Sequence, residues 1–425
     1  MDFRIINDEK INEKIYFGEH RSGLGVIIVP KKDFSKKYAI IGARIGSVDN
    51  KFIPIGEKEP YSIPDGVAHF LEHKLFEQPD GSNAFDKFSM YGASANAYTS
   101  FTNTCYLFSC TDNFNESLDH LLSYVYEPYF TDENVSKEQG IIGQEIKMYD
   151  DDADWCVMFN LLKCLYNKCP VRIDIAGTVE SISHITKDVL YKCYNTFYNP
   201  SNMVLCIAGD VDIDRVSEII DKNLPEVKTG EAAVSLYPDE PQNICKKENI
   251  QNMSVSVPLF NIGFKDNELA KGDELVKNDI AADIILRTLF SKSSDLYYDM
   301  YREGLINDEF SYDSMYEEGF ACVMVGGESR NPREVDRRIM EYISNKIEIT
   351  REEVERCKKA MWGSYMRSFN NVEAIARIFM QNVFRSNDPL SFERAFEEVS
   401  VDFVNKKYKS LFKEENKALS IVNPM

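Results

Sequence analysis

The sequence predicts an α+β protein built from two related domains, and three observations carry this prediction. The first half reads as strands, then helices, then a buried strand. The stretch 224–252 breaks this pattern with three prolines and a glycine, and a strand-and-helix order begins again at residue 253. We therefore expect a first domain over 1–223, a linker over 224–252 and a related second domain over 253–425.

The third observation is a pair of short matches between the halves. Phe70–Phe76 can be aligned with Ile284–Phe290, 214 residues later, and Thr131–Val135 with Thr350–Val354, 219 residues later. Either match alone could arise by chance. Because both occur in the same order in each half, they indicate a duplicated α+β domain.

Apolar runs mark the expected strands. Val26–Val29 and Tyr38–Ile45 are short runs with the length and composition of sheet strands. The pattern returns to strand over Ala95–Cys110, where aromatic residues stand among threonines. Met203–Gly209 reads as a buried strand that ends in a turn, and alternation over Met253–Leu259 predicts the first strand after the linker.

Three helices are expected between these strands. In the first, over 67–75, apolar residues recur at helical spacing, and Asp65 stands where it can cap the helix N-terminus. Two further helical patterns span about 114–126 and 132–149. Thr131 precedes the last of these as an expected N-cap.

Composition narrows the class of function. The 425 residues include 49 Lys and Arg against 69 Asp and Glu, a net charge of −20. Such a chain is a poor candidate for binding nucleic acid or anionic membranes, and the charge favours solubility or, as an alternative, basic peptide partners. We find no apolar run near the ~18 residues of a membrane span and no signal-peptide pattern. Ten scattered cysteines without a Cys-x-x-Cys pair are typical of reduced thiols, so we expect a cytoplasmic protein.

The segment from His69 to His73 carries the strongest chemical signal. On a helix, with His69 at zero, Glu72 stands at ~300° and His73 at ~40°, so the three side chains share one face. Two histidines four residues apart can hold one metal ion, and the glutamate between them can act on a water molecule there. The alternative is a polar surface helix, which Phe70 and Leu71 disfavour because they place the helix against a core.

A catalytic metal site needs a third protein ligand, and a chain with five histidines most simply supplies a carboxylate. The helix Val135–Tyr149 offers Glu138 and Glu145, which share one face because they are seven residues apart. One could bind the ion while the other accepts a hydrogen bond from a ligating imidazole. The spacing leaves open which glutamate does which.

Taken together, these segments resemble the pitrilysin/insulinase family of metallopeptidases, whose zinc motif has the inverted order His-x-x-Glu-His. Gly66–His73 resembles the zinc helix of the family, Ser94–Ser100 its substrate-edge strand and Gly177–Ile182 a further recurrent stretch. The glutamates seven residues apart repeat its downstream pair. The resemblance covers 15–215 strongly and 250–425 loosely.

The resemblance implies a role for each of these positions. The ligands of one Zn²⁺ ion per chain would be three side chains: His69, His73 and Glu145. Glu72 would be the general base, and Glu138 would support a ligating histidine from outside the ligand set. Asn96 and Ala97 would help to hold a peptide that lies as an added strand along the sheet edge.

In the second half the resemblance implies two further catalytic residues. Leu296–Leu305 resembles the stretch that carries an arginine of the family, which makes Arg302 the candidate, and Tyr312 would be the accompanying tyrosine. The intervening segment Ile306–Ser311 is slightly longer than the family pattern.

The second half is expected to lack a zinc site. In place of the two histidines it has Asp283 and Arg287, and in place of the two glutamates it has Cys357 and Ser364. The resemblance implies two homologous domains, each an antiparallel-rich sheet packed against helices, that form half of a clamshell. Short two-domain, bacterial-type members similar to processing peptidases need a second chain to close the chamber, so we expect a homodimer or a heterodimer with a related chain.

The implied function is a zinc-dependent endopeptidase that acts on peptides or unfolded segments. The alternative is a catalytically silent or partner-dependent peptide-binding subunit of a heterodimeric processing peptidase. The intact set of His69, Glu72, His73 and Glu145 favours the enzyme, because a binding subunit has no need for a metal-binding face with a base beside it.

Overall fold

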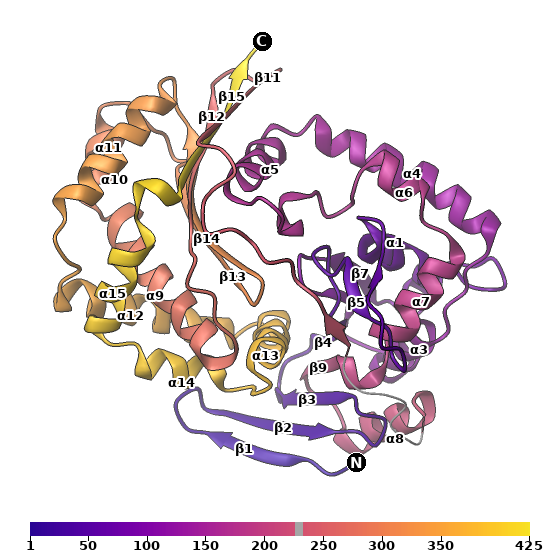
Figure 1. The fold of residues 1–425 in the computed structure, drawn as a ribbon. Helices are drawn as coiled ribbons and strands as arrows, with labels where there is room; N and C mark the ends of the chain where they lie inside the picture. Colours follow the sequence, from indigo (N-terminus) through magenta and orange to yellow (C-terminus); the bar gives the residue numbers. More distant parts are fainter. Residues whose placement is uncertain (226–232) are drawn as a thin grey trace. The chain divides into compact units, whose positions relative to one another are not determined.

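The computed structural model describes residues 1–225 and 233–425 (Figure 1). The chain divides into two compact units, each assembled from three segments. The first unit consists of Met1–Ile146, Asp174–Tyr237 and Tyr365–Pro389. The second unit consists of Lys147–Ile173, Pro238–Ser364 and Leu390–Met425. Residues 226–232 of the predicted linker lie outside the described residues.

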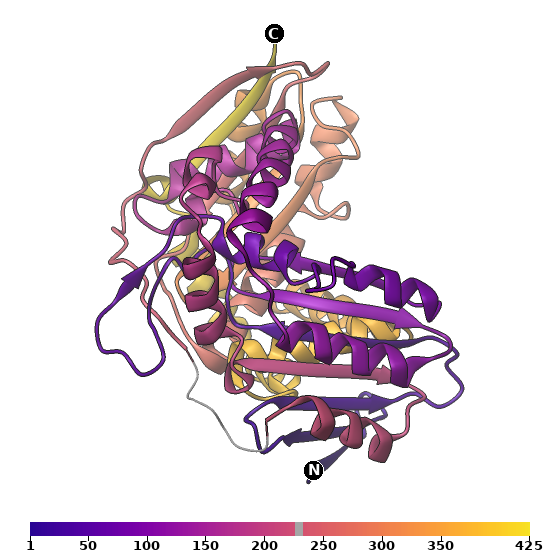
Figure 2. The ribbon, with the colours of Figure 1, turned by 90° about the vertical axis from the view of Figure 1, so that its right-hand side faces the viewer.

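The first unit contains a seven-stranded sheet whose strands run side by side (Figure 2). Their spatial order is β1 (Arg4–Asp8), β2 (Glu13–Glu19), β3 (Gly25–Pro30), β9 (Met203–Gly209), β4 (Lys37–Ala43), β8 (Thr104–Cys110) and β7 (Ser94–Thr99). The pair β3–β9 is parallel and the other neighbours are antiparallel. A small second sheet has the order β10 (Val234–Ser235), β5 (Lys51–Ile53) and β6 (Tyr61–Ser62). The strand β7 is therefore an edge strand.

Helices cover both faces of this sheet. They are α1 (Val67–Lys74), α2 (Ala84–Met90), α3 (Phe114–Tyr126), α4 (Asp132–Asp150), α6 (Val179–Ser183), α7 (Lys187–Phe197), the short η2 (Pro200–Asn202), α8 (Ile213–Asn223) and α13 (Val372–Ser386). Apolar residues of α1 and α3, such as Phe70 and Leu121, share one core with Ile41 and Tyr106 of the sheet. The helix α13, from the far end of the sequence, packs on β4 and β9. The strands predicted at 26–29, 38–45 and 203–209 are confirmed, and the predicted run 95–110 is the hairpin β7–β8.

The start of α1 differs from the expectation. The prediction that Asp65 caps this helix is wrong: Asp65 Oδ1 accepts a hydrogen bond from Asn50 Nδ2 at 3.0 Å. The N-cap residue is Gly66, which has φ 94° and makes no side-chain cap. A Cβ at this position would lie 2.4 Å from the carbonyl oxygen of Ala176, so only glycine fits. The tight entry through Gly66 therefore fixes where the motif helix begins.

The predicted N-cap of α4 is confirmed. The helix begins at Asp132, directly after Thr131. Asn134 N–H donates to Thr131 Oγ1 at 3.1 Å, and Thr131 N–H donates to Asn134 Oδ1 at 2.8 Å. This reciprocal pair satisfies two amide groups at the start of the helix, with asparagine in the position usually held by glutamate.

The sheet of the second unit repeats the strand order of the first. Its order is β11 (Glu248–Met253), β15 (Lys417–Pro424), β12 (Leu259–Lys265), β14 (Phe320–Glu328) and β13 (Ser311–Glu317). The pair β11–β15 is parallel and the others are antiparallel, as in the series β3-β9-β4-β8-β7. The predicted strand over 253–259 is wrong, because β11 ends at residue 253 and β12 begins at 259. The shared order confirms the predicted α+β fold with two related domains.

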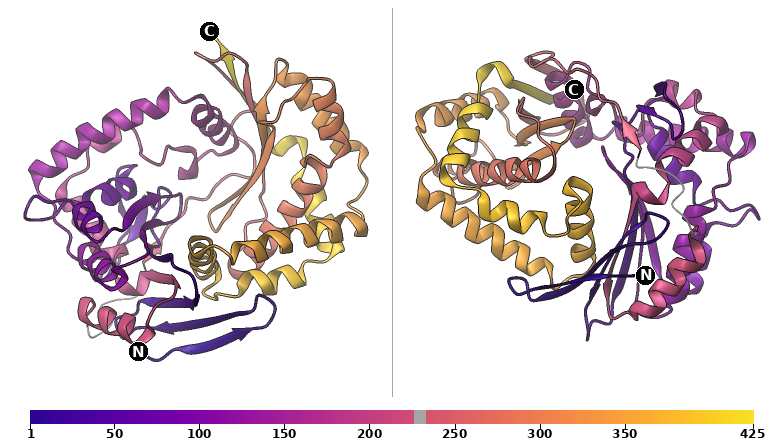
Figure 3. Two further views of the ribbon diagram at one scale, coloured as in Figure 1. Left: turned by 180° about the vertical axis from the view of Figure 1, so that it is seen from behind. Right: turned by 60° about the horizontal axis from the view of Figure 1, so that its bottom comes forward.

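The second unit has helices on both faces of its sheet (Figures 1 and 3). They are α5 (Ala153–Leu165), η1 (Pro170–Arg172), α9 (Gly272–Phe290), α10 (Asp295–Arg302), α11 (Pro332–Asn345), α12 (Arg351–Ser368), α14 (Ser391–Glu398), α15 (Val401–Leu411) and η3 (Glu414–Asn416). The helix α5 packs on β12 and β15, through contacts such as Val157 with Leu259 and Val422. Each sheet is thus covered on one face by a helix from the other half of the sequence.

The predicted domains, 1–223 and 253–425, are the two duplicated halves of the sequence. The compact units divide the chain differently, so the predicted boundaries stay a prediction. Across the two described stretches of the chain, none of the helices has both the length and the apolar character that crossing a membrane requires.

Candidate metal centre and edge strand

The helix α1 and the helix α4 bring the three predicted ligands together. The rings of His69 and His73 lie on one face of α1 with their centroids 4.6 Å apart. Glu145 reaches them from α4: its Oε1 lies 3.6 Å from His69 Nε2, and its Oε2 lies 3.5 Å from His73 Nε2. Within the described ranges, these three residues are the group of His, Cys, Asp and Glu side chains whose ligand atoms are close enough to hold a metal ion.

These distances fit a shared zinc ion. A tetrahedral site with bonds of about 2.0–2.1 Å separates its ligand atoms by about 3.3 Å, close to the observed values and longer than a good hydrogen bond. The Nδ1 atom of His69 is buried without a hydrogen-bond partner among the described atoms, so the atom of this ring that is placed to bind an ion is Nε2, which lies beside Glu145. Two imidazoles and one carboxylate are a ligand set of catalytic zinc sites, which keep a fourth position open.

Glu138 and Lys74 support the centre from the other side of His73. Glu138 Oε1 lies 3.1 Å from His73 Nδ1, and its Oε2 lies 3.6 Å from Lys74 Nζ. Lys74 is fully buried and also pairs with Glu77. The geometry thus places Glu145 beside the Nε2 atoms of both histidines and Glu138 beside Nδ1 of His73, a choice that the spacing alone left open. The sequence interpretation missed Lys74, for which the only signal was the acidic residue one turn later.

Burial and charge set the protonation states at this centre. Burial, with a smaller contribution from His73, lowers the pKa of His69 to about 3, so its imidazole is neutral near pH 7, the form that binds metals. Burial lowers the pKa of His73, but the hydrogen bond to Glu138 and the charge of Glu145 outweigh it and raise the pKa overall. Burial raises the pKa of Glu138, but the hydrogen bond from His73 and the charge of Lys74 hold it below its usual value.

Glu72 lies on the same helix and is held by the edge strand. Thr99 Oγ1 donates a hydrogen bond of 2.6 Å to Glu72 Oε2. Burial raises the pKa of Glu72, and the hydrogen bond from Thr99 opposes this shift. A carboxylate with a raised pKa beside a metal-binding face has the properties of a general base. The sequence interpretation did not single out Thr99, although it lies within the segment that resembles the substrate-edge strand.

The edge strand β7 leaves backbone groups unpaired with the sheet. Ser100 N–H donates to Asn103 O at 2.8 Å where the hairpin begins. Because every second residue of an antiparallel strand turns its backbone N–H and C=O groups to the same neighbour, those of Tyr98 and Asn96 point towards β8. The amide of Ala97 therefore points to the open edge, where Asn96 Oδ1 accepts its hydrogen at 2.9 Å. Both residues predicted to hold a peptide thus lie at an edge that can accept another strand.

Arg302 and Tyr312 lie in the second unit. Arg302 is exposed at the end of α10, 3.7 Å from Asp299 and with its guanidinium 5.6 Å from the ring centroid of Tyr298. Tyr312 is half-buried on β13, where burial raises its pKa. Their roles towards the metal centre stay a prediction.

The second unit carries an ion pair where the repeat would place the two histidines. Arg287 Nε donates to both carboxylate oxygens of Asp283 at 2.9 Å, one turn apart on α9. Cys357 Sγ lies 3.4 Å from Thr288 Oγ1. The cation of Arg287 thus lies against the carboxylate of Asp283 at the positions that correspond to the two histidines of the first half.

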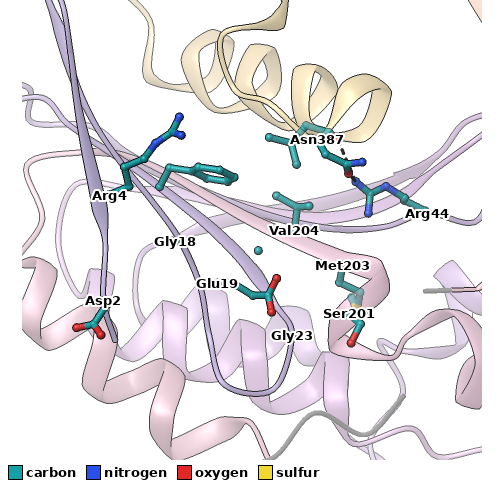
Figure 4. Close-up of a pocket in the computed structure, with 13 residues that line it drawn as sticks. Asp2, Arg4, Gly18, Glu19, Gly23, Arg44, Ser201, Met203, Val204 and Asn387 are labelled. Atoms are coloured by element: carbon teal, nitrogen blue, oxygen red, sulfur yellow. Dashed lines mark hydrogen bonds between the residues drawn. The ribbon is translucent and has the colours of Figure 1, made fainter. Parts of the chain in front are cut away.

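A cavity of about 490 Å³ lies elsewhere in the first unit and contains none of the predicted site residues (Figure 4). Among its lining residues, Arg44 donates from Nη2 to Val383 O at 2.9 Å and to Asn387 Oδ1 at 2.7 Å. Its guanidinium also lies 5.2 Å from the ring centroid of Phe384. Arg44 therefore ties the C-terminal end of α13 to the sheet.

A repeated α+β fold with a His-x-x-Glu-His helix and a glutamate from a second helix defines the class of inverted zinc-motif metallopeptidase folds. The chain belongs to the insulinase family, peptidase family M16. Residues 53–179 match the family described as insulinase (peptidase family M16), and residues 184–361 match the peptidase M16 inactive domain. The resemblance seen in the sequence is thereby confirmed.

Individual relatives agree with this assignment. The chain is 42% identical over 409 residues to "Uncharacterized zinc protease YmfH" of Bacillus subtilis, covering 94% of both proteins. It is similar to the crystal structure of an M16-like protein of Alicyclobacillus acidocaldarius, with a TM-score of 0.94 and 34% identity. The match covers 99% of this chain and 100% of that one. It is also 28% identical over 191 residues to the mitochondrial-processing peptidase subunit beta of Caenorhabditis elegans, covering 44% of this chain and 42% of that one.

Proposed function

We propose that this chain is a zinc-dependent endopeptidase that hydrolyses peptides or unfolded segments. The observation that carries the proposal is the approach of Glu145 to within 3.6 Å of two imidazole nitrogens, beside the half-buried Glu72 and an open sheet edge. The zinc-protease name of the Bacillus subtilis relative supports the same chemistry. His69, His73 and Glu145 would hold one Zn²⁺ ion per chain.

Zinc, when bound, would polarise the scissile carbonyl and make a water molecule more acidic. Glu72 takes the proton of the attacking water and passes it to the leaving amine. Thr99 orients the Glu72 carboxylate for this transfer through their hydrogen bond. Glu138 fixes the ring of His73 through Nδ1, and Lys74 holds Glu138 in turn.

The substrate would add to β7 as a further strand. Backbone groups at the open edge, including the amide of Ala97, would pair with an extended peptide once the Asn96 side chain moves away. Because this mode reads backbone rather than side chains, it suits unfolded segments of many sequences. We propose that Arg302 and Tyr312 add contacts to the substrate from the second half.

A second chain would complete the substrate chamber. The relative from Caenorhabditis elegans is named as a subunit, which supports assembly of this chain with a copy of itself or with a related chain. The cytoplasm is the proposed compartment, because eight of the ten cysteines are buried as free thiols.

The test is to incubate the purified, zinc-loaded chain with unstructured peptides of graded length and to identify the products by mass spectrometry. Glu72→Gln keeps the shape of the side chain and removes the base. Cleavage by the wild type alone would support the proposal. Failure of zinc-loaded wild type to cleave would overturn the self-sufficient enzyme and favour the alternative, a partner-dependent peptide-binding subunit.

A further inference from the structure

The open edge of β7 lies between two faces that carry different groups. Thr99 faces α1, where it bonds to Glu72. Tyr98 faces the opposite way: Cys105, its partner on β8, contacts Met380 of α13 with the sulfur atoms 3.6 Å apart. Because side chains alternate along a strand, a peptide paired with β7 would present every second side chain to the α13 face, away from the metal centre.

A cation lies beside Tyr98 on this face. Arg377 of α13 places its guanidinium carbon 4.9 Å from the ring centroid of Tyr98 and 5.9 Å from that of Tyr38. Stacking on aromatic rings uses the flat face of a guanidinium and leaves the N–H groups at its rim free to donate. Arg377 is therefore oriented by the ring of Tyr98 on the edge strand β7 and by the more distant ring of Tyr38 on β4.

The helix that carries Arg377 is fixed to the sheet at both ends. Near its C-terminus, Arg44 bonds to Val383 O and to Asn387, as Figure 4 shows for the second contact. Near its N-terminus, Glu373 pairs with Lys36, which precedes β4. The backbone of Arg377 is thus held against the sheet by contacts near both ends of its helix.

The charge of Arg377 is available to a ligand. The side chain is exposed, and it forms no salt bridge within the part of the chain that the structure describes. The acidic residue one turn earlier on α13, Glu373, is already paired with Lys36. In a chain of net charge −20, the general field favours basic peptides, so any preference for an acidic group at this edge must come from a local cation.

We propose that Arg377, supported by Tyr98, is a specificity-determining residue that binds a carboxylate of the peptide on the α13 face of β7. The carboxylate belongs to the peptide residue paired opposite Tyr98, or to a C-terminus that ends there. This inference rests on the proposed function, because it takes β7 as the strand to which the peptide adds. The charge-assisted hydrogen bond between Arg377 and the carboxylate would select the peptide side chain at one position. Elsewhere along β7 the peptide is bound through its backbone groups.

The experiment is a positional scan with peptides that the wild type cleaves. Each position on both sides of the cleaved bond is changed in turn to Glu, Gln or Lys, in peptides with blocked termini. The wild type is expected to prefer Glu over Lys by about three- to tenfold in kcat/KM at one position, the size of an exposed charge pair. The same peptides with a free C-terminus at that position test the second source of the carboxylate.

Two substitutions and one control test whether Arg377 causes this preference for Glu over Lys. Arg377→Ala is expected to abolish the preference, and Arg377→Glu to invert it in favour of Lys. The control is Lys14→Glu, which makes the same change of charge at an exposed cation stacked 4.8 Å from the ring centroid of Tyr16 on β2. Lys14→Glu should keep the preference of the wild type, which excludes a general effect of net charge.

Binding of the same peptides to Glu72→Gln, followed by fluorescence anisotropy, separates this inference from the proposed function. A charge preference in Kd that depends on Arg377 would support the inference even if no variant cleaves, in which case the proposed function alone fails. Cleavage with no charge preference at any position, or a preference that Arg377→Glu leaves unchanged, would overturn the inference and leave the proposed function intact.

Discussion

Thr99 donates a hydrogen bond of 2.6 Å to Glu72, across 27 residues of sequence, and so joins the edge strand to the motif helix. Thr99 is the last residue of β7, and Glu72 stands between the two histidines of α1. The strand at which a peptide would bind therefore also orients the carboxylate that would act on it. The position of the base and the position of the substrate edge are coupled by a single hydroxyl group.

Replacing this hydroxyl group should slow the chemical step. In Thr99→Val, Glu72 loses a hydrogen bond to its charged form, which is worth about 1.5–3 kcal/mol, so kcat should fall about ten- to a hundredfold. KM should change little, because the peptide pairs with backbone groups. Thr99→Ser keeps the hydroxyl group and should retain most of the activity. Steady-state kinetics of the three proteins measure this difference.

The matched control is Thr111→Val, which removes a hydroxyl that contacts Asp112 beyond the end of β8. It should behave as the wild type. A wild-type kcat in Thr99→Val would show that Glu72 does not depend on this bond for its orientation.

Zinc affinity should separate the two glutamates of α4. Glu145→Gln removes the charge of the proposed third ligand and should lose zinc at chelator concentrations that the wild type tolerates. Glu138→Gln keeps all three proposed ligands but weakens the support of His73, so its zinc affinity should fall about 10- to 100-fold. Competition with a chromophoric chelator gives both values without reference to catalysis.

Glu133→Gln serves as the control for these two variants, because Glu133 is exposed in the first turn of the same helix. Its zinc affinity should match that of the wild type. Equal losses in Glu138→Gln and Glu145→Gln would contradict the division of roles between them.

Local periodicity was enough to predict the face shared by His69, Glu72 and His73, because a helix fixes those angles without help from the rest of the fold. It could not choose between Glu138 and Glu145, since both share one face of α4 and the choice depends on how α4 packs against α1. Thr99 and Lys74 were missed for the same reason. The pairing of Thr99 with Glu72 and of Lys74 with Glu138 is set by packing and by burial, which no spacing reports.

The fold, like the site, was predictable from the sequence only in part. The duplication was predictable from two matched stretches in the same order, but the strand order was not, because strands such as β11 and β13 have no apolar run. The packing of α13 on one sheet and of α5 on the other was not predictable either, because the sequence pattern of an amphipathic helix is the same whichever sheet it packs against. The stretch 224–252 read as a linker from its prolines and glycine, yet it contributes β10, β11 and the buried carboxylate of Glu240.

Gly66→Ala should destabilise the first unit and disturb the motif helix. Gly66 has φ 94°, and a new Cβ would meet a backbone oxygen at 2.4 Å, which cannot move as a side chain would. We expect a loss of about 2–4 kcal/mol in the free energy of unfolding, from left-handed strain plus the steric clash. Gly56→Ala is the matched control, because Gly56 has φ 79° but open space around it, so strain alone should cost about 1–2 kcal/mol. Equal costs in urea unfolding would contradict this account.

Glu240 lies in the predicted linker, but its carboxylate accepts hydrogen bonds from residues of the second unit. Its carboxylate accepts backbone hydrogen bonds of 2.7–2.8 Å from Asn167, Lys168 and Cys169 and one of 2.6 Å from Lys265 Nζ. The side chains of Lys265 and Glu240 are 2% and 8% exposed. Burial raises the pKa of Glu240, but the amide of Asn167, the ammonium of Lys265 and the other two amides outweigh it and lower the pKa overall.

Stability should therefore depend on the ionisation of Glu240. Because its pKa in the folded protein lies below the unfolded value of about 4.3, the ionised carboxylate stabilises the second unit above that pH, and this contribution disappears as the pH falls through the folded pKa. Glu240→Gln should cost about 2 kcal/mol at neutral pH, lowering Tm, and the difference from the wild type should shrink below about pH 4. Glu341→Gln, which removes an exposed partner of Arg337, is the control and should shift Tm little at any pH. A Tm difference between wild type and Glu240→Gln that stays constant into acid would mean that packing, and not the charge of Glu240, holds this part of the unit together.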